Sequence, residues 1–164
     1  MKHPITQTSN GLAVYVDLVR SPAGLHIAEQ PYILGFIRET LEQAKLEDQV
    51  VRIEQDMGRN IGYDYVTKTG DSDTVFYARL IRDETYTRFV KNGKPQPTHF
   101  LTMILKRDDD GAYELRDAWV GHMCPPRPGS DDENHESKLY WEGHAHVFDR
   151  QPLQSRTITR VCPY

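Results

Sequence analysis

The chain has 164 residues, of which 38% are hydrophobic and 27% are charged, and its formal net charge is −4. These values are typical of a globular protein and argue against a disordered or fibrous chain and against a dedicated, strongly basic nucleic-acid binder. No apolar run approaches the ~20 residues that span a bilayer, and residues 1–20 lack a basic stretch followed by an apolar one. We therefore expect a cytoplasmic protein with no membrane contact.

The N-terminal third alternates between strand and helix patterns. Leu12–Val19 alternates in polarity like a half-buried strand, and Ser21-Pro22-Ala23-Gly24 then reads as a break in the structure. Pro31–Lys45 has apolar residues at helical spacing and a proline suited to the first turn. Gln49–Gln55, rich in valine and isoleucine, predicts a further strand.

Short strands are then expected in meander order. The first three cover Tyr63–Thr69, Thr74–Arg82 and Tyr86–Val90. The strongest supersecondary signal is a hairpin with alternating arms and a turn that ends in Asp-Gly. Its arms are Thr98–Lys106 and Tyr113–Val120.

The C-terminal part is less regular. The stretch from Gly121 to Asn134 is rich in proline, glycine and acidic residues and predicts a surface loop. Ser137–Val147 predicts a short helix, and the tail from Arg150 to Tyr164 either adds an edge strand or is loosely held. Taken together, residues 1–164 predict a single α+β domain, an antiparallel sheet of five or six strands with one or two helices packed on one face.

Several common chemistries have no motif in this sequence. The phosphate-binding patterns GxxxxGK[ST] and GxGxxG are missing, as is the esterase pattern GxSxG. Cys124 and Cys162 have no CxxC-type partner and are expected to be reduced thiols. The sequence therefore predicts no cofactor.

A basic and aromatic segment is the main candidate for function. Between Arg79 and Arg107 there are seven basic residues against two acidic ones, and rings alternate with cations in a strand context. Such a face can stack bases on aromatic rings while guanidinium and ammonium groups hold phosphates. The RNA-binding candidates are Tyr77, Tyr86, Phe89 and Lys106.

Metal-independent RNA cleavage needs a base for the 2′-hydroxyl, a cation for the charged phosphorane and an acid for the leaving oxygen. Basic residues supply the cation, histidines such as His99 or His122 the base or acid, and hydroxyl groups orient the phosphate. The catalytic candidates are Arg79, Arg88, Lys91, His99 and Thr102. Two structural alternatives stay open. The segment can be a solvated face whose arginine stems cover rings, and His99, which shares a face with Leu101, can be a buried histidine.

From about Pro31 to Val120 the order of elements resembles that of the barnase–EndoU–colicin–RelE group of small ribonuclease toxins. The basic–aromatic strand and the hairpin THFLTMILKRDDDGAYELRDAWVG carry this resemblance. It implies an RNA-cleaving antiparallel sheet preceded by helices. Its implied catalytic set of histidine, cation and hydroxyl falls on His99, Arg79, Arg88, Lys91 and Thr102. The chain departs from the group in its acidic charge and in offering only His26 near the usual helical position of a histidine.

Two other functions remain open. Between Asp108 and Glu136 there are nine acidic residues against two basic ones, so the loop 121–134, with Trp119 at its root, can serve a non-catalytic protein-interaction module. A divalent-metal hydrolase is the third option, because four histidines crowd the C-terminal third: His122, His135, His144 and His146. Neither HExxH nor paired CxxC occurs, and in a helix His144 and His146 point apart, so packed histidines are the alternative. The expected partner is RNA or a protein, and the oligomeric state is not indicated.

Overall fold

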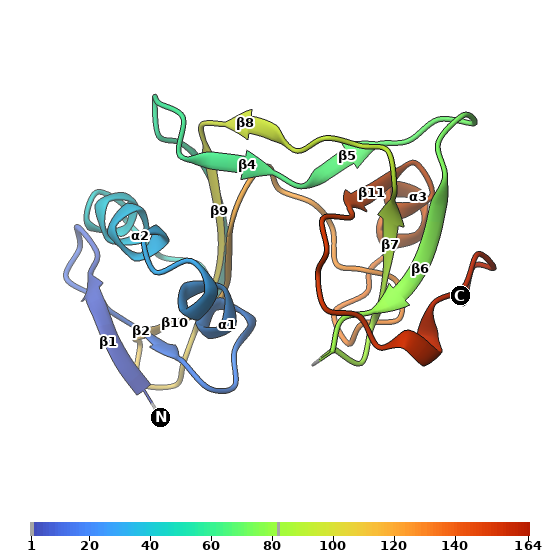
Figure 1. The fold of residues 1–164 in the computed structure, drawn as a ribbon. Coiled ribbons are helices and arrows are strands. Elements are labelled where there is room, and N and C mark those ends of the chain that lie inside the picture. Colours follow the sequence, from blue (N-terminus) through green and yellow to red (C-terminus); the bar gives the residue numbers. More distant parts are fainter. Residues whose placement is uncertain (1, 82) are drawn as a thin grey trace. The chain divides into compact units, whose positions relative to one another are not determined.

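The computed structural model describes residues 2–81 and 83–164 and has an α+β architecture (Figure 1). The described part of the chain contains three α-helices, eleven strands and one short 3-10 turn. This confirms the expected fold class. None of the described helices is long and apolar enough to cross a membrane.

The chain divides into two compact units, which the sequence pattern did not indicate. Unit 1 runs to Gly62 and resumes over Pro97–Met123, while unit 2 consists of Tyr63–Gln96 and Cys124–Tyr164. The chain passes between the units through two short strands that pair as a two-stranded sheet, β4 (Gly62–Asp64) and β8 (Gln96–Thr98).

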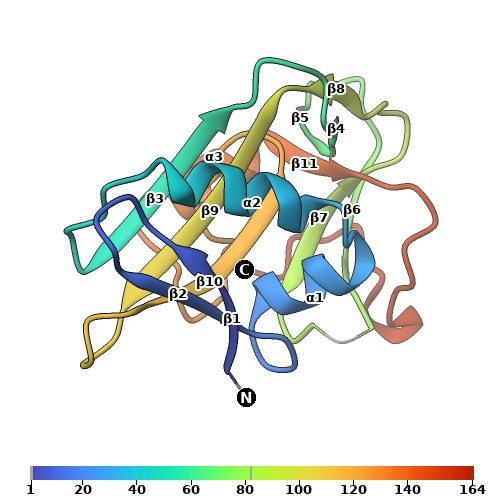
Figure 2. The same ribbon diagram turned by 90° about the vertical axis from the view of Figure 1, so that its left-hand side faces the viewer.

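Unit 1 is built on a five-stranded sheet in the order β1-β2-β10-β9-β3. All neighbours are antiparallel except β2 and β10, which run parallel. Helices α1 and α2 pack on one face of this sheet (Figure 2). The elements of unit 1 are β1 (Lys2–Gln7), β2 (Ala13–Asp17), α1 (Pro22–Glu29), α2 (Ile33–Glu42), β3 (Val50–Asp56), β9 (Phe100–Arg107) and β10 (Tyr113–Val120).

The predicted hairpin forms the centre of this sheet. Leu101, Met103 and Leu105 alternate along β9 onto the helix-covered face, and all three are fully buried. Leu115 of β10 lies opposite Leu105, so the two arms bury one continuous apolar layer. Alternation in the sequence matches the buried face of β9 and of the start of β10. After the irregularity between Leu115 and Asp117, Ala118 and Val120 are buried in place of Asp117 and Trp119, which alternation alone puts on the core face.

Helix α1 begins where the sequence suggested a break. The Ser21 side chain caps the helix by accepting a hydrogen bond from the Gly24 N–H at 3.0 Å, and Pro22 occupies the first turn. Ser-Pro is thus a helix start here, and the prediction of a break at residues 21–24 was wrong.

A histidine–carboxylate contact connects α1 to the sheet. His26 Nδ1 lies 3.1 Å from Asp117 Oδ1 and 2.7 Å from the carbonyl oxygen of Ala118. Asp117 is placed at an irregularity in the pairing of β10 with β9. This local shift brings the carboxylate to the helix.

The stabilising effect of this contact is expected to fade as the pH rises. Burial opposes the imidazolium, but the hydrogen bond and charge of Asp117 outweigh it and raise the pKa of His26 above its ordinary value of 6.5. A raised folded-state pKa stabilises the fold fully below the unfolded pKa, and this contribution is lost as the pH climbs through the folded-state pKa. The difference in urea midpoint between wild type and Asp117→Asn should decline from about pH 6.5 upward. In a His26→Gln background, the difference in urea midpoint caused by Asp117→Asn should not change with pH. If this difference were independent of pH in the wild-type background as well, the His26–Asp117 contact would not be the cause.

Unit 2 contains a four-stranded sheet in the order β5-β11-β7-β6. Strands β11 and β7 run parallel, and the other pairs are antiparallel. Its elements are β5 (Val66–Lys68), β6 (Val75–Arg79), β7 (Tyr86–Val90), α3 (Ser137–Glu142), β11 (His144–Val147) and the 3-10 turn η1 (Ser155–Thr157).

The expected helix over Ser137–Val147 ends early. Helix α3 stops at Glu142, Gly143 follows it, and residues 144–147 form β11. His144 and His146 therefore share one face of a strand. His144 stacks on Tyr140 with ring centroids 3.9 Å apart, and His146 stacks on Trp141 at 5.1 Å. The helix prediction beyond residue 142 was wrong because tertiary pairing with β5 and β7 overrides local pattern.

The C-terminal tail lies along the free edge of β6. Tyr77 and Thr159 exchange two backbone hydrogen bonds, of 2.7 and 2.8 Å. Gln154 donates its N–H to the Arg79 carbonyl, and the Thr157 hydroxyl accepts the Arg79 N–H. Of the two alternatives for the tail, the structure shows an edge-pairing segment.

Candidate functional site

Strands β6 and β7 bring four of the predicted site residues onto one face. Tyr77 lies directly opposite Arg88, and Arg79 lies directly opposite Tyr86. Because opposite residues of an antiparallel pair point to the same side, the four side chains share a face and alternate cation with ring. We call this set, Tyr77, Arg79, Tyr86 and Arg88, the arginine–tyrosine face.

The opposite side of the same hairpin is core. Phe76 and Phe89 are 5% and 1% exposed and stack with ring centroids 5.3 Å apart. A ring so buried offers no surface for a base, so Phe89, predicted as an RNA-binding residue, belongs to the core. Lys91 follows β7 on this side, with its ammonium group 5.7 Å from the Phe76 ring centroid. It is exposed but lies apart from the arginine–tyrosine face.

Arg79 rests on an aromatic ring, and its Nε has no acceptor in the described part of the chain. Its Cζ lies 4.7 Å from the Tyr86 ring centroid, a cation–π arrangement. Its Nε is buried and has no hydrogen-bond partner among the described residues. Buried donors are usually paired, so the unpaired Nε of Arg79 is an exception within the described chain.

Arg88 is held in place by one edge of its guanidinium. Nη1 donates to Thr69 Oγ1 at 2.8 Å and to the His144 carbonyl at 3.0 Å. Its Nε is likewise buried without an acceptor in the described chain. Arg88 is therefore a cation whose orientation is fixed by hydrogen bonds to the protein.

Tyr77 lies between Arg88 and the tail. The ring of Tyr164 meets it edge to face, with centroids 5.8 Å apart. Burial raises the pKa of the Tyr77 hydroxyl, against the lowering effect of its hydrogen bond with Arg88. Burial also raises the pKa of Tyr164 to about 12. Both hydroxyls therefore stay protonated at neutral pH and can act as hydrogen-bond donors.

The remaining candidates belong to unit 1. Thr102 is fully buried in β9, where its hydroxyl donates to the Gly121 carbonyl at 2.8 Å, which is a structural role. His99 is exposed just before β9, with Nδ1 3.7 Å from Asp56 Oδ1, so the alternative of a buried histidine was wrong. Lys106 is exposed in β9, opposite Val50.

The acidic loop 121–134 is fixed at its proline-rich part. In unit 2, the Trp141 indole donates to the Pro125 carbonyl, and Arg127 binds both Thr87 and Asp83. The acidic residues from Asp131 onward are exposed. Arg127, which local pattern did not single out, is thus the anchor of the loop.

The histidines do not assemble a metal centre. Over residues 2–81 and 83–164, no group of three or more His, Cys, Asp or Glu side chains is arranged to hold a metal ion. The His122 ring contacts the Phe100 ring in a tilted arrangement, with centroids 4.3 Å apart, and His135 is exposed. His144 and His146 stack on residues of α3, as described above. Arg82, counted in the basic segment, lies outside the described residues.

Comparison with protein-family models, with curated proteins and with solved structures finds no match to this chain.

Proposed function

We propose that the chain binds single-stranded RNA through the arginine–tyrosine face of unit 2. The observation that carries this proposal is the pair of half-buried arginines that alternate with two tyrosines on one face. A phosphodiester group suits such a pair of cations, because its oxygens accept hydrogen bonds from a guanidinium in a charge-assisted geometry.

The tyrosines add the second half of an RNA site. Tyr86 is half-buried and already carries a cation on one side of its ring, so its rim can contact a base or sugar. Single-stranded RNA presents unstacked bases that pack on aromatic rings, whereas duplex RNA presents mainly its backbone. These features support a preference for single strands.

Cleavage by this face would also need a base for the 2′-hydroxyl proton, and none of the four residues of the face is such a base. The arginines can stabilise the charged phosphorane, and a protonated tyrosine hydroxyl such as that of Tyr77 can donate to the leaving oxygen. His144 and His146 alternate onto the other side of the sheet, with Phe89. Binding is therefore the function that the geometry supports best, and cleavage is the additional outcome to be tested.

The test is a titration of the purified chain with labelled single-stranded RNA at two salt concentrations in the presence of a chelator, followed by a denaturing gel. We expect binding that weakens with salt, because phosphate contacts compete with counterions. Cleavage products under chelation would extend the proposal to a metal-independent ribonuclease. Binding that is absent at low salt would overturn it.

A further inference from the structure

The edge strand β3 of unit 1 is a second candidate surface, independent of RNA binding. Strand β3 is the last strand of its sheet, paired with β9 on one side only (Figure 2). Exposed strand edges are templates for pairing with another chain unless they are protected. The edge of β3 is seven residues long and contains no proline.

The hydrogen-bond pattern shows which backbone groups this edge presents. Arg107 donates to the Gln49 carbonyl, and Met57 donates to the His99 carbonyl. Odd-numbered residues of β3 are therefore the ones bonded to β9, since bonded and non-bonded positions alternate. The even-numbered residues turn their N–H and C=O groups outward: Val50, Arg52, Glu54 and Asp56.

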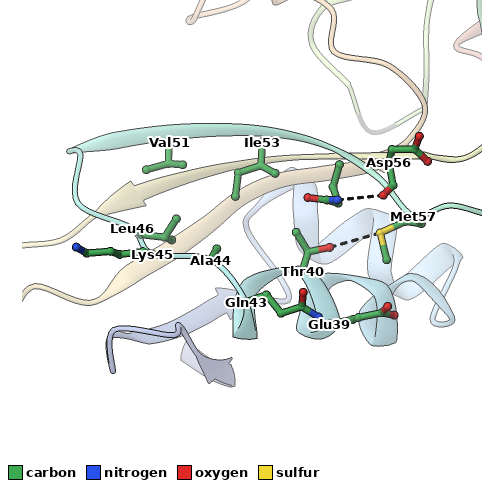
Figure 3. A pocket seen from close by; sticks show the side chains of 11 residues that line it. Glu39, Thr40, Gln43, Ala44, Lys45, Leu46, Val51, Ile53, Asp56 and Met57 are labelled. Carbon is green, nitrogen blue, oxygen red and sulfur yellow. Dashed lines mark hydrogen bonds between the residues drawn. The ribbon is translucent and has the colours of Figure 1, made fainter.

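A groove borders the same edge on the helix-covered side. Its volume is about 600 Å³, and it lies between β3, the end of α2 and the segment that joins them. Figure 3 shows Val51 and Ile53 on the same side of β3, facing α2 and the segment that joins it to β3, with Leu46 near Val51 and Met57 near Thr40. Val51 and Ile53 are only half-buried, so part of this apolar floor meets solvent.

We propose that β3 pairs antiparallel with β3 of a second copy of this chain, about a two-fold axis at Ile53. The two five-stranded sheets then form one continuous sheet. Such an axis runs perpendicular to the sheet, so α2 of both copies lies on the same side and the two grooves meet over the central Ile53 pair. A two-fold interface uses the same patch twice and must be self-complementary.

Charge complementarity selects this register. With the axis at Ile53, Arg52 of each copy lies directly opposite Glu54 of the other, twice over, and the whole of β3 is paired. If the two-fold axis moves by one residue to Arg52, the Arg52 side chains of the two copies lie directly opposite each other. If it moves to Glu54, the two Glu54 side chains lie directly opposite each other, although Arg52 then lies opposite Asp56 of the other copy. Like charges directly opposite one another destabilise a strand pair.

The two charged side chains are ready for this contact. Glu54 is oriented on the outer side of the sheet, where it accepts the Met123 N–H at 2.6 Å and lies 3.6 Å from His122. Arg52 is exposed and takes part in no ion pair among the described residues. The competing explanation is that charges on this edge prevent pairing, as they do in many proteins.

Charge exchange separates the two explanations. We expect wild type to dimerise in sedimentation velocity between about 1 μM and about 1 mM. Arg52→Glu should weaken association at least about 10-fold, because two ion pairs become two repulsions. The double variant Arg52→Glu/Glu54→Arg should recover it. Arg20→Glu, the same charge change at an exposed turn of unit 1, is the control and should leave association unchanged.

A disulfide test checks the axis itself. In the proposed register Ile53 faces its own copy at a non-hydrogen-bonded position, with Cα atoms about 4.5 Å apart, within reach of a disulfide. Ile53→Cys in a Cys124→Ser/Cys162→Ser background should cross-link on oxidation. Val51→Cys should not, because its two copies are offset by roughly 13 Å along the strands.

Several results would overturn the proposal. These are a monomeric wild type at the highest concentration, equal effects of Arg52→Glu and Arg20→Glu, no recovery in the double variant, or cross-linking of Val51→Cys in preference to Ile53→Cys.

Discussion

Replacement of both Arg79 and Arg88 by alanine is expected to weaken single-stranded RNA binding by at least about 100-fold. Each guanidinium contributes hydrogen bonds to a charged acceptor, and such bonds are each worth about 1.5–3 kcal/mol. The loss of two phosphate contacts should also lower the slope of log K against log salt by about 1.4 for a single strand. Fluorescence anisotropy at several salt concentrations measures both quantities.

Two comparisons make this result specific. Lys94→Ala/Lys138→Ala removes the same net charge from exposed positions of unit 2 and should change affinity only slightly. Arg79→Lys/Arg88→Lys keeps the charge but loses the planar fork, so its affinity should lie between wild type and the alanine pair. Because Arg88 also binds Thr69 and the His144 carbonyl, circular dichroism must show a retained fold. If Lys94→Ala/Lys138→Ala lost as much affinity as Arg79→Ala/Arg88→Ala, the arginine–tyrosine face would not be the RNA site.

Gly24→Ala is expected to lower the free energy of unfolding by about 3 kcal/mol, the upper end of the usual cost of overpacking. A Cβ at this position of α1 would meet the carbonyl oxygen of Asp17 at 2.5 Å and the Cα of Leu18 at 2.6 Å. Both are backbone atoms, so no side chain can move aside. Helix α1 would have to shift away from the end of β2.

Gly35→Ala is the matched change in α2. Nothing lies within 4 Å of a Cβ built there, and alanine favours a helix interior over glycine. This variant should therefore raise the free energy of unfolding by about 0.5–1 kcal/mol. Urea unfolding should show that the free energy of unfolding falls in Gly24→Ala and rises in Gly35→Ala. A Gly24→Ala protein as stable as wild type would show that α1 does not approach β2 as closely as described.

The central hairpin of unit 1 could be predicted because apolar and polar residues alternate along β9 and the start of β10 and its turn contains Asp-Gly. The irregularity between Leu115 and Asp117 was not visible in this pattern. Helix α1 was missed because proline and glycine within four residues suggest a break, whereas Ser21 and Pro22 are also a helix start. Strand β11 was missed because Trp141 and His144 fit helical spacing equally well. Its conformation is decided by pairing with β5 and β7, which are distant in the sequence.

The candidate site could be predicted in part for a related reason. Alternation along β6 and β7 places Arg79 with Tyr86, but only the register shows that Phe89 turns into the core. The contact between Tyr77 and Tyr164 joins the two separate chain segments that make up unit 2. No local pattern contains that information.

The position of β10 has a consequence for synthesis of the chain on the ribosome. β10 lies between β2 and β9, so β2 lacks its inner neighbour until residues near the end of unit 1 have emerged from the exit tunnel. During that time β10 is not yet available to pair with β2, so the apolar side chains of Val14 and Val16 stay exposed in the nascent chain. Pairing at such long sequence separation gives a high contact order and slow folding. A chaperone that shields apolar strands should therefore raise the soluble yield of this protein more than a slower rate of translation alone.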